Sequence, residues 1–403
     1  MSQATRRTAI LSGLAGLGGV AGAATLAGCT GSGTAATGPS GAPAGPTGPG
    51  ARARAFRGAR QAGIIEHPQP YAAFVAFTLR AGADRDALRR LFTVWTDDIE
   101  RLTSGRGTLT DLEGELAAVS ARLTVTVGIG RRAVTVAGKT PPQWLVPLPA
   151  YSIDRLQARW GEADLVLQIC ADSPTTVAHA QRRLITSVAP LADVRWVQRG
   201  FREPFEGPGL PMRNLLGQVD GTSQPAIDGA DDALLFVGDA GPEWLRGGSA
   251  MIVRRIAMTL DTWDKLDRAG RENAIGRRLD TGGPVTGGGI EATLDLSRTD
   301  ELGFTVVDQA AHVRRALPEH PHERFLRRPY SYDDPPEGTA SASNSGLIFV
   351  AYCADPVRQF VPVLARLAER DLLNIWTVPI GSAVFVALPG AQDGEILGQA
   401  LLS

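Results

Sequence analysis

Three kinds of side chain in this sequence could together move a proton, bind a metal and stabilise a developing negative charge. Asp220 lies in Gly217-Gln-Val-Asp-Gly-Thr222, where glycines let the backbone approach a ligand closely. His312 stands alone in its segment, and Arg327 and Arg328 are adjacent. A carboxylate, a neutral imidazole and a guanidinium are groups that can cleave a peroxide at haem iron.

Each of these residues also has an ordinary structural explanation. Asp-Gly is a common turn signal, so Asp220 could simply shape a turn. His312 could be a packed or surface histidine, and the Arg327-Arg328 pair could be a solvated basic face. The segment Pro329-Tyr-Ser-Tyr332 follows the arginines and indicates a turn, which suits the rim of a pocket.

Two further positions carry weaker signals. Arg277 lies in a glycine-rich loop, 276–284, which could hold a haem propionate or form a surface turn. Asp355 could cap the helix that follows it, or it could orient an axial histidine and strengthen its bond to iron. The remaining histidines are weaker ligand candidates: His67, His179, His320 and His322.

The first residues predict export from the cell. Thr5-Arg-Arg-Thr8 precedes a weakly apolar run, and residues 1–29 are typical of a twin-arginine signal, although a membrane anchor is the alternative. Leu26-Ala-Gly-Cys29 resembles a lipobox, in which Cys29 is acylated, although an ordinary cleavage site would also explain it. Residues 30–55 then form a flexible linker, rich in Gly, Ala and Pro at its start.

Composition excludes several classes of protein. The net charge is -1, so no basic surface indicates nucleic-acid binding. Three cysteines cannot build a disulfide scaffold, and five histidines argue against a multi-histidine metal site. About 350 residues remain after the linker, which is enough for two domains.

An internal repeat predicts the fold. A strand, a turn and a helix follow one another from Asp164 to Leu184, and the same design recurs from Gly346 to Arg370. Cys170 and Cys353 hold equivalent positions, so we expect them in different sheets as free thiols.

Other segments complete this prediction. Residues 71–79, 122–128 and 383–388 have strand patterns, 304–307 is strand-like, and 85–102 has helical spacing. The fold class is therefore α+β, with two ferredoxin-like domains whose antiparallel sheets are related by internal duplication. We expect the domains to span 56–212 and 213–403, which places Asp220 close to the domain junction.

The ordered set of motifs resembles the dye-decolorizing peroxidases over nearly the whole chain after the linker. The motifs that carry the resemblance are Gly217–Thr222, His312-Val-Arg, Arg327-Arg-Pro-Tyr-Ser-Tyr332, Gly346-Leu-Ile-Phe349, Asp355-Pro and Gln359-Phe360. The resemblance implies one haem b in the C-terminal domain. It also implies that Asp220 is the distal acid, Arg327 the distal arginine and His312 the proximal iron ligand.

The same resemblance assigns residues around the haem and leaves one choice open. It places Gly221, Thr222, Ser223 and Arg277 along the haem. A short interval between His312 and the arginine pair leaves either Arg327 or Arg328 facing the haem. The twin-arginine signal is similar to that of the exported branch, which includes deferrochelatases linked to iron uptake.

The expected function is a haem peroxidase that uses hydrogen peroxide to oxidise bulky donors such as phenols and dyes. Because such donors are too large for a haem pocket, Tyr330, Tyr332 or Trp376 could relay electrons at the surface. The alternative is a lipoprotein of an iron-uptake system that handles haem or iron. In either case Cys29 could attach the protein to a membrane, and the chain could form a homo-oligomer.

Overall fold

The computed structural model describes residues 53–203, 212–336 and 343–403. The predicted signal and lipobox (1–29) and nearly all of the predicted linker (30–55) lie outside the described residues, so they stay predictions. Among the residues described, no helix has the length and apolar character needed to cross a membrane.

Between residues 53 and 203, the described part of the N-terminal half contains four strands and two long helices. Its elements are β1 Tyr71–Leu79, α1 Arg85–Thr103, η1 Gly114–Leu116, β2 Thr124–Ile129, α2 Arg131–Val136, η2 Ala158–Trp160, β3 Leu165–Ala171, α3 Pro174–Val188 and β4 Ala192–Phe201. The strands pair antiparallel in the order β2-β3-β1-β4. This order, with helices after the first and third strands of the motif, is that of a ferredoxin-like fold.

The C-terminal half repeats this order. Its elements are α4 Asp232–Leu235, η3 Glu243–Leu245, β5 Ser249–Met258, α5 Leu260–Trp263, α6 Arg268–Ile275, α7 His312–Ala316, β6 Leu326–Arg327, β7 Tyr330–Asp334, β8 Asn344–Cys353, α8 Pro356–Gln359, α9 Val361–Arg370, η4 Leu372–Ile375 and β9 Thr377–Ala387. Strands β9, β5, β8 and β7 pair in that order, and β6 also pairs with β8. The repeated strand order supports the predicted duplication.

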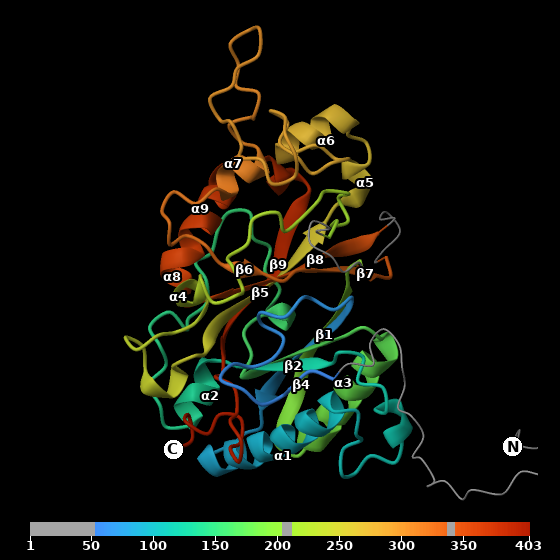
Figure 1. Ribbon diagram of the computed structural model, residues 1–403, viewed down its shortest axis with the longest axis vertical. Coiled ribbons are helices and arrows are strands. Elements are labelled where there is room, and N and C mark those ends of the chain that lie inside the picture. Colours follow the sequence, from blue (N-terminus) through green and yellow to red (C-terminus); the bar gives the residue numbers. More distant parts are fainter. Residues whose placement is uncertain (1–52, 204–211, 337–342) are drawn as a thin grey trace, which may run out of the picture. The chain divides into compact units, whose positions relative to one another are not determined.

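The two halves share one continuous antiparallel sheet. Strand β2 pairs with β9, β4 pairs with β7, and the β5–β8 pairing closes a barrel-like ring. Inward-facing side chains fill its interior, including Phe74, Tyr352 and Phe385. Figure 1 shows α1 and α3 against the N-terminal strands and α7 to α9 against the C-terminal strands.

Local sequence specifies the long helices. Asp84 caps α1 by accepting a hydrogen bond from the Ala87 N–H, and Ser173 caps α3 in the same way. The buried face of α1 has apolar residues at three- and four-residue spacing, and Trp95 within it donates from Nε1 to the Leu184 carbonyl at 3.1 Å. The two helices therefore pack together over the sheet.

The free-thiol prediction is confirmed, but its reason was wrong. Cys170 on β3 and Cys353 on β8 are both buried and unbridged. They lie on equivalent strands, as the repeat predicted, but those strands belong to one continuous sheet. Pairing between the halves could not be read from the repeat, because it joins strands that are far apart in the chain.

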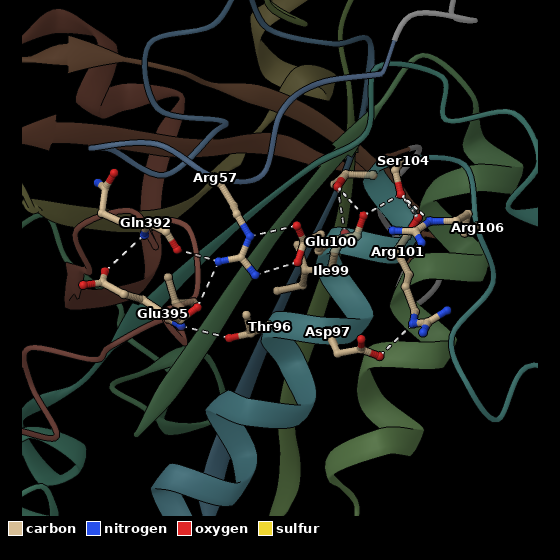
Figure 2. A network of polar contacts seen from close by, with 12 residues as sticks. Arg57, Thr96, Asp97, Ile99, Glu100, Arg101, Ser104, Arg106, Gln392 and Glu395 are labelled. Atoms are coloured by element: carbon tan, nitrogen blue, oxygen red, sulfur yellow. Dashed lines mark hydrogen bonds and ion pairs between the residues drawn. The ribbon is translucent and has the colours of Figure 1, made fainter.

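The segment before β1 and the C-terminal tail are both tied to α1 (Figure 2). Arg57 donates to the Glu100 carboxylate at 2.8 and 2.7 Å, which lowers the pKa of Glu100. The same guanidinium donates to the carbonyls of Gln392 and Glu395 at 2.5 and 3.0 Å. Leucines of the tail then complete the hydrophobic core of the N-terminal half.

The partly buried carboxylate of Glu162 lies at the point where β2 and β9 separate. These strands pair at only two positions. Further along β9, the Val384 N–H donates to the two oxygens of the Glu162 carboxylate at 3.2 and 3.3 Å. Burial penalises the charged form and raises the pKa of Glu162 to about 7.

We expect Glu162→Gln to stabilise the protein above pH 7. The folded-state pKa of Glu162 is raised above its ordinary value of 4.5, so the native state binds more protons than the unfolded chain across this window. Stability is therefore lost as pH rises from about 4.5 to 7, by about 3 kcal/mol. Thermal midpoints measured from pH 4 to 8 should be higher for the variant than for the native protein only at the upper end of this pH range. Glu301→Gln, on an exposed loop, is the control, and an equal gain at every pH would contradict the assignment.

Candidate active site

Asp220 lies on a tight loop beside two cavities. Its N–H donates to the Met212 carbonyl at 2.7 Å. Gly217 and Gly221 have φ of 78° and 90°, a left-handed conformation that glycine adopts without steric cost. The turn interpretation and the functional interpretation are therefore compatible: the glycines form the turn, and the carboxylate lines the cavities.

The three predicted chemical groups meet at one of these cavities. A cavity of about 190 Å³ is lined by Asp220, His312 and Arg327, and by the other residues predicted to line the haem: Gly221, Thr222, Ser223 and Arg277. A second cavity, of about 390 Å³, shares Asp220 and Arg327 and adds Arg202. The structure thus brings each of these predicted residues to one cavity.

His312 is the first residue of α7, and its ring is held from one side. Its Nδ1 lies 2.6 Å from Oδ2 of Asp371, while the Asp371 Oδ1 accepts the Leu373 N–H at 2.9 Å. Burial disfavours the charged imidazole, but the Asp371 carboxylate favours it and raises the pKa of His312 overall. Because Nδ1 is engaged, Nε2 is the nitrogen available to a metal.

The acid that orients His312 is Asp371, and the prediction of Asp355 was wrong. Asp355 is the N-cap of α8, where its side chain accepts the N–H groups of Val357 and Arg358 at 2.9 and 3.2 Å. Its carboxylate is used by the helix end, which was the ordinary alternative for this residue.

The structure separates the two adjacent arginines. The Arg327 side chain lines both cavities, and its Nη2 donates to the Ser223 carbonyl at 2.8 Å. Arg328 is buried and lines only the second cavity, and its guanidinium donates to the Glu66 carbonyl and to the Gln69 Oε1. Successive side chains of extended backbone point to opposite faces, and only Arg327 lines the smaller cavity together with His312.

Arg277 braces the glycine-rich loop at the cavity wall. Its Nη1 donates to the carbonyls of Gly282 and Ile290 at 2.8 and 2.9 Å. Burial, followed by the nearby charge of Arg327, lowers the pKa of Arg277. Two cations at one cavity favour an anionic ligand group.

The expected surface relay residues are placed differently from the prediction. Tyr330 and Tyr332 are fully buried inside the barrel, so neither can meet a donor at the surface. Trp376 is half-buried, with its ring 5.0 Å from that of Trp263. Alternation along β7 buries both tyrosines because they are two residues apart and share a face.

Several atoms of the site indicate a group that fills the smaller cavity. Gln218 is 2% exposed, yet its Oε1 and Nε2 have no hydrogen-bond partner among the described residues, nor has the buried Nε of Arg327. Buried polar groups without partners are costly, which points to a ligand. The His312 side chain is 38% open despite its deep position, because it faces this space. An available imidazole nitrogen and cationic groups fit an iron porphyrin with its two carboxylates.

Sequence reasoning missed Asp371, and it did not predict that Gln218 is buried. Asp371 contacts His312 across 59 positions of the chain, and no local motif marks that pairing. Gln218 lay inside the motif that we singled out, but its burial was not visible from its polar character. The available signal was the position of Gln218, which lies two residues before the acid in a turn bounded by Gly217 and Gly221.

Comparisons with known proteins decide the family. A family model described as "Dyp-type peroxidase, N-terminal" matches residues 61–202, and one described as "Dyp-type peroxidase, C-terminal" matches residues 211–392. The chain belongs to the Dyp-type peroxidase family. Its fold class and its function as a DyP-type peroxidase are therefore confirmed.

Individual relatives agree with this assignment of the DyP-type peroxidase. A dye-decolorizing peroxidase of Thermobifida fusca (strain YX) is 38% identical over 332 residues, covering 79% of this chain and 76% of the relative. A deferrochelatase of Escherichia coli (strain K12) is 33% identical over 381 residues, 86% of each chain. The crystal structure of a DyP-type peroxidase from Cellulomonas bogoriensis is 50% identical with a TM-score of 0.86, covering 89% of this chain and 100% of that one.

Family membership fixes the general chemistry of the site. Enzymes of the DyP family bind haem, and they use hydrogen peroxide together with an electron donor. The acid, the arginine and the histidine around one cavity suit this chemistry, because peroxide cleavage needs proton transfer and charge stabilisation beside an iron ligand.

Proposed function

We propose that this DyP-type peroxidase binds haem b in the cavity lined by Asp220, His312 and Arg327, and that it oxidises bulky donors such as phenols and dyes. The observation that carries the proposal is the meeting of these three side chains at one cavity. They come from segments far apart in the chain, and unpartnered buried atoms accompany them.

Residues of the C-terminal half would hold the haem. His312 would provide Nε2 to the iron, and Asp371 would fix the ring through Nδ1. Arg277 and Arg327 would face carboxylates of the porphyrin or the peroxide. When bound, haem supplies the iron at which peroxide is reduced.

The distal groups would act on the two peroxide oxygens. Asp220 would accept a proton from one oxygen and return it to the departing one. The Arg327 guanidinium would stabilise the negative charge that develops on the departing oxygen. A backbone bond to the Met212 carbonyl fixes the loop that carries Asp220, and the bond to the Ser223 carbonyl orients the Arg327 guanidinium before peroxide binds.

Bulky donors would give up electrons outside this cavity. The cavity that would hold the porphyrin is the smaller of the two beside Asp220, so we place the oxidation of bulky donors outside it. Trp376 is the remaining candidate relay of the three that the sequence suggested, since its ring is partly open.

The test is to load the purified protein with haem and mix it rapidly with hydrogen peroxide. We expect a Soret band that changes within milliseconds of mixing, followed by its recovery when a phenolic donor is added. A protein that binds haem without any peroxide-dependent spectral change would refute the peroxidase proposal and favour a carrier.

We expect Asp371→Asn to weaken haem retention about tenfold to a hundredfold. The amide cannot supply the negative charge that orients and strengthens the His312 imidazole. Transfer of haem to apomyoglobin measures the loss directly, without reliance on turnover. Asp355→Asn is the matched control and should retain haem like the native protein; the reverse result would restore Asp355 as the partner.

A second candidate function is favoured by the deferrochelatase similarity. The E. coli relative bears that name and matches most of this chain, so an iron-handling role in an uptake system is the alternative. Free iron released from haem, assayed with a ferrous chelator in the absence of peroxide, separates the two roles.

We also propose that the twin-arginine signal exports the enzyme and that acylated Cys29 anchors it to a membrane. The support is the arginine pair and the lipobox-like segment of the sequence. Mass spectrometry of the mature N-terminus would show a diacylated cysteine, and an unmodified or differently cleaved terminus would contradict the anchor. Sedimentation of the mature protein would test for a homo-oligomer.

A further inference from the structure

A third cleft lies away from the haem site, in the N-terminal half. Its volume is about 740 Å³, larger than either cavity beside Asp220, and it opens where β2 and β9 separate. Helix α2, strand β4 and the loop before β3 form its walls. A cleft of this size can hold a ligand of ordinary small-molecule dimensions.

Within the part of the chain that the structure describes, two guanidinium groups of the cleft form no ion pair, although the charge of Arg195 acts on the Glu162 carboxylate at the same wall. Arg131 and Arg195 line it, donate only to the backbone carbonyls of Leu145 and Ala158, and form no ion pair among the described residues. The third arginine, Arg132, is paired with Asp164 at 2.5 Å. Two cations are thus available to an anion.

The rest of the lining is mainly apolar and includes one perturbed carboxyl. Val146, Pro147 and Val384 provide apolar surface. Burial raises the pKa of Glu162, at the same wall, to about 7. A cleft with apolar walls, convergent charged groups and a shifted carboxyl has the features of a binding site.

We propose that this cleft binds a small organic anion with an apolar body. The acidic group would contact Arg195 and Arg131, and the apolar body would lie against Val146 and Val384. Neither arginine lines the cavities around Asp220, so this site is separate from the proposed haem site and does not depend on it.

The probe is naphthalene-2-sulfonate, with neutral naphthalene-2-methanol as its uncharged counterpart. Calorimetric titration of the haem-loaded protein should show one sulfonate bound per chain, more tightly than the neutral compound and more weakly at high salt. Arg195→Gln should weaken sulfonate binding about tenfold, because a charge-assisted hydrogen bond is lost. Peroxidase activity with a small donor should not change in this variant.

Arg199→Gln is the matched control for this loss. Arg199 is an exposed arginine of the same strand, but it donates towards Gln181 and does not line the cleft. Val146→Trp, at a residue that is 40% exposed, should block the apolar part of the cleft and also weaken binding. Absence of binding, equal affinity in all these variants, or a sulfonate-dependent shift of the Soret band with the same affinity would overturn the proposal.

The pH dependence gives an independent test of location. Protonation of Glu162 removes a negative charge, so sulfonate affinity should rise several-fold from pH 8 to 6. The other charged groups that face Glu162 are guanidiniums, which stay charged, and Asp164, which is paired with Arg132. Glu162→Gln should remove this pH dependence, and its persistence in the variant would contradict binding in this cleft.

Discussion

Replacing Asp220 with asparagine should slow the reaction of the haem-loaded enzyme with hydrogen peroxide about 10³-fold. Asparagine keeps the size of the side chain and its backbone neighbours, but it cannot accept the proton that must move between the peroxide oxygens. Haem content should stay near that of the native protein, because Asp220 is not the proposed iron ligand. Stopped-flow absorbance at the Soret band gives the rate constant, and the pyridine haemochrome assay gives the content.

A second Asp-Gly turn in the same half provides the control. Asp228 precedes Gly229, its Oδ1 accepts the Ala230 N–H at 3.1 Å, and its side chain lines neither cavity. Asp228→Asn should therefore react with peroxide at the native rate. If Asp220→Asn were as fast as the native enzyme at every pH, Asp220 would have no role in proton transfer.

The sequence predicted the parts of this molecule that local patterns control. Spacing along α1 and the repeated strand, turn and helix design specified the elements, and both thiols were found where the repeat placed them. The glycines around Asp220 marked a backbone that needs positive φ, which is a local requirement. Such features follow from neighbouring residues, so one sequence is enough to reveal them.

Features that depend on distant partners were not predictable in the same way. The ring closes through two-residue pairing of β2 with β9, and one register pair joins β4 to β7. The strand expected over 304–307 makes only an isolated bridge, between Thr299 and Thr305. One expected helix, 357–370, is divided at Phe360, because Pro362 lacks the N–H that a continuous helix would use there.

Asp371 shows the same limit within the site. Both Asp355 and Asp371 lie beside helix ends and both accept backbone N–H groups. Only the docking of α7 against η4, including the bond from the Leu372 N–H to the Ala310 carbonyl at 2.9 Å, brings one of them to His312. The sequence shows which carboxylates are candidates, but only the packing of the fold decides which of them contacts His312.

Replacing Arg327 with leucine should slow peroxide cleavage about 10²- to 10³-fold, while Arg328→Leu should leave that rate within a few-fold of native. Arg327 supplies a positive charge at the cavity shared with Asp220, whereas Arg328 is 1% exposed and bonded to Glu66 and Gln69. Loss of Arg328 should instead lower stability by about 2 kcal/mol, because the buried Gln69 Oε1 loses its donor.

The two leucine variants therefore test which arginine faces the smaller cavity, because one should lose rate and the other should lose stability. Stopped-flow rates should separate Arg327→Leu from the native enzyme, and thermal unfolding should separate Arg328→Leu. Arg327→Lys keeps a charge but not the fork that donates to the Ser223 carbonyl, so its rate should fall between those of leucine and arginine. A slow Arg328→Leu enzyme with an unchanged thermal midpoint would mean that the cavity uses the other arginine. Because only Arg327 lines the cavity that also contains His312, we expect the loss of rate in Arg327→Leu and not in Arg328→Leu.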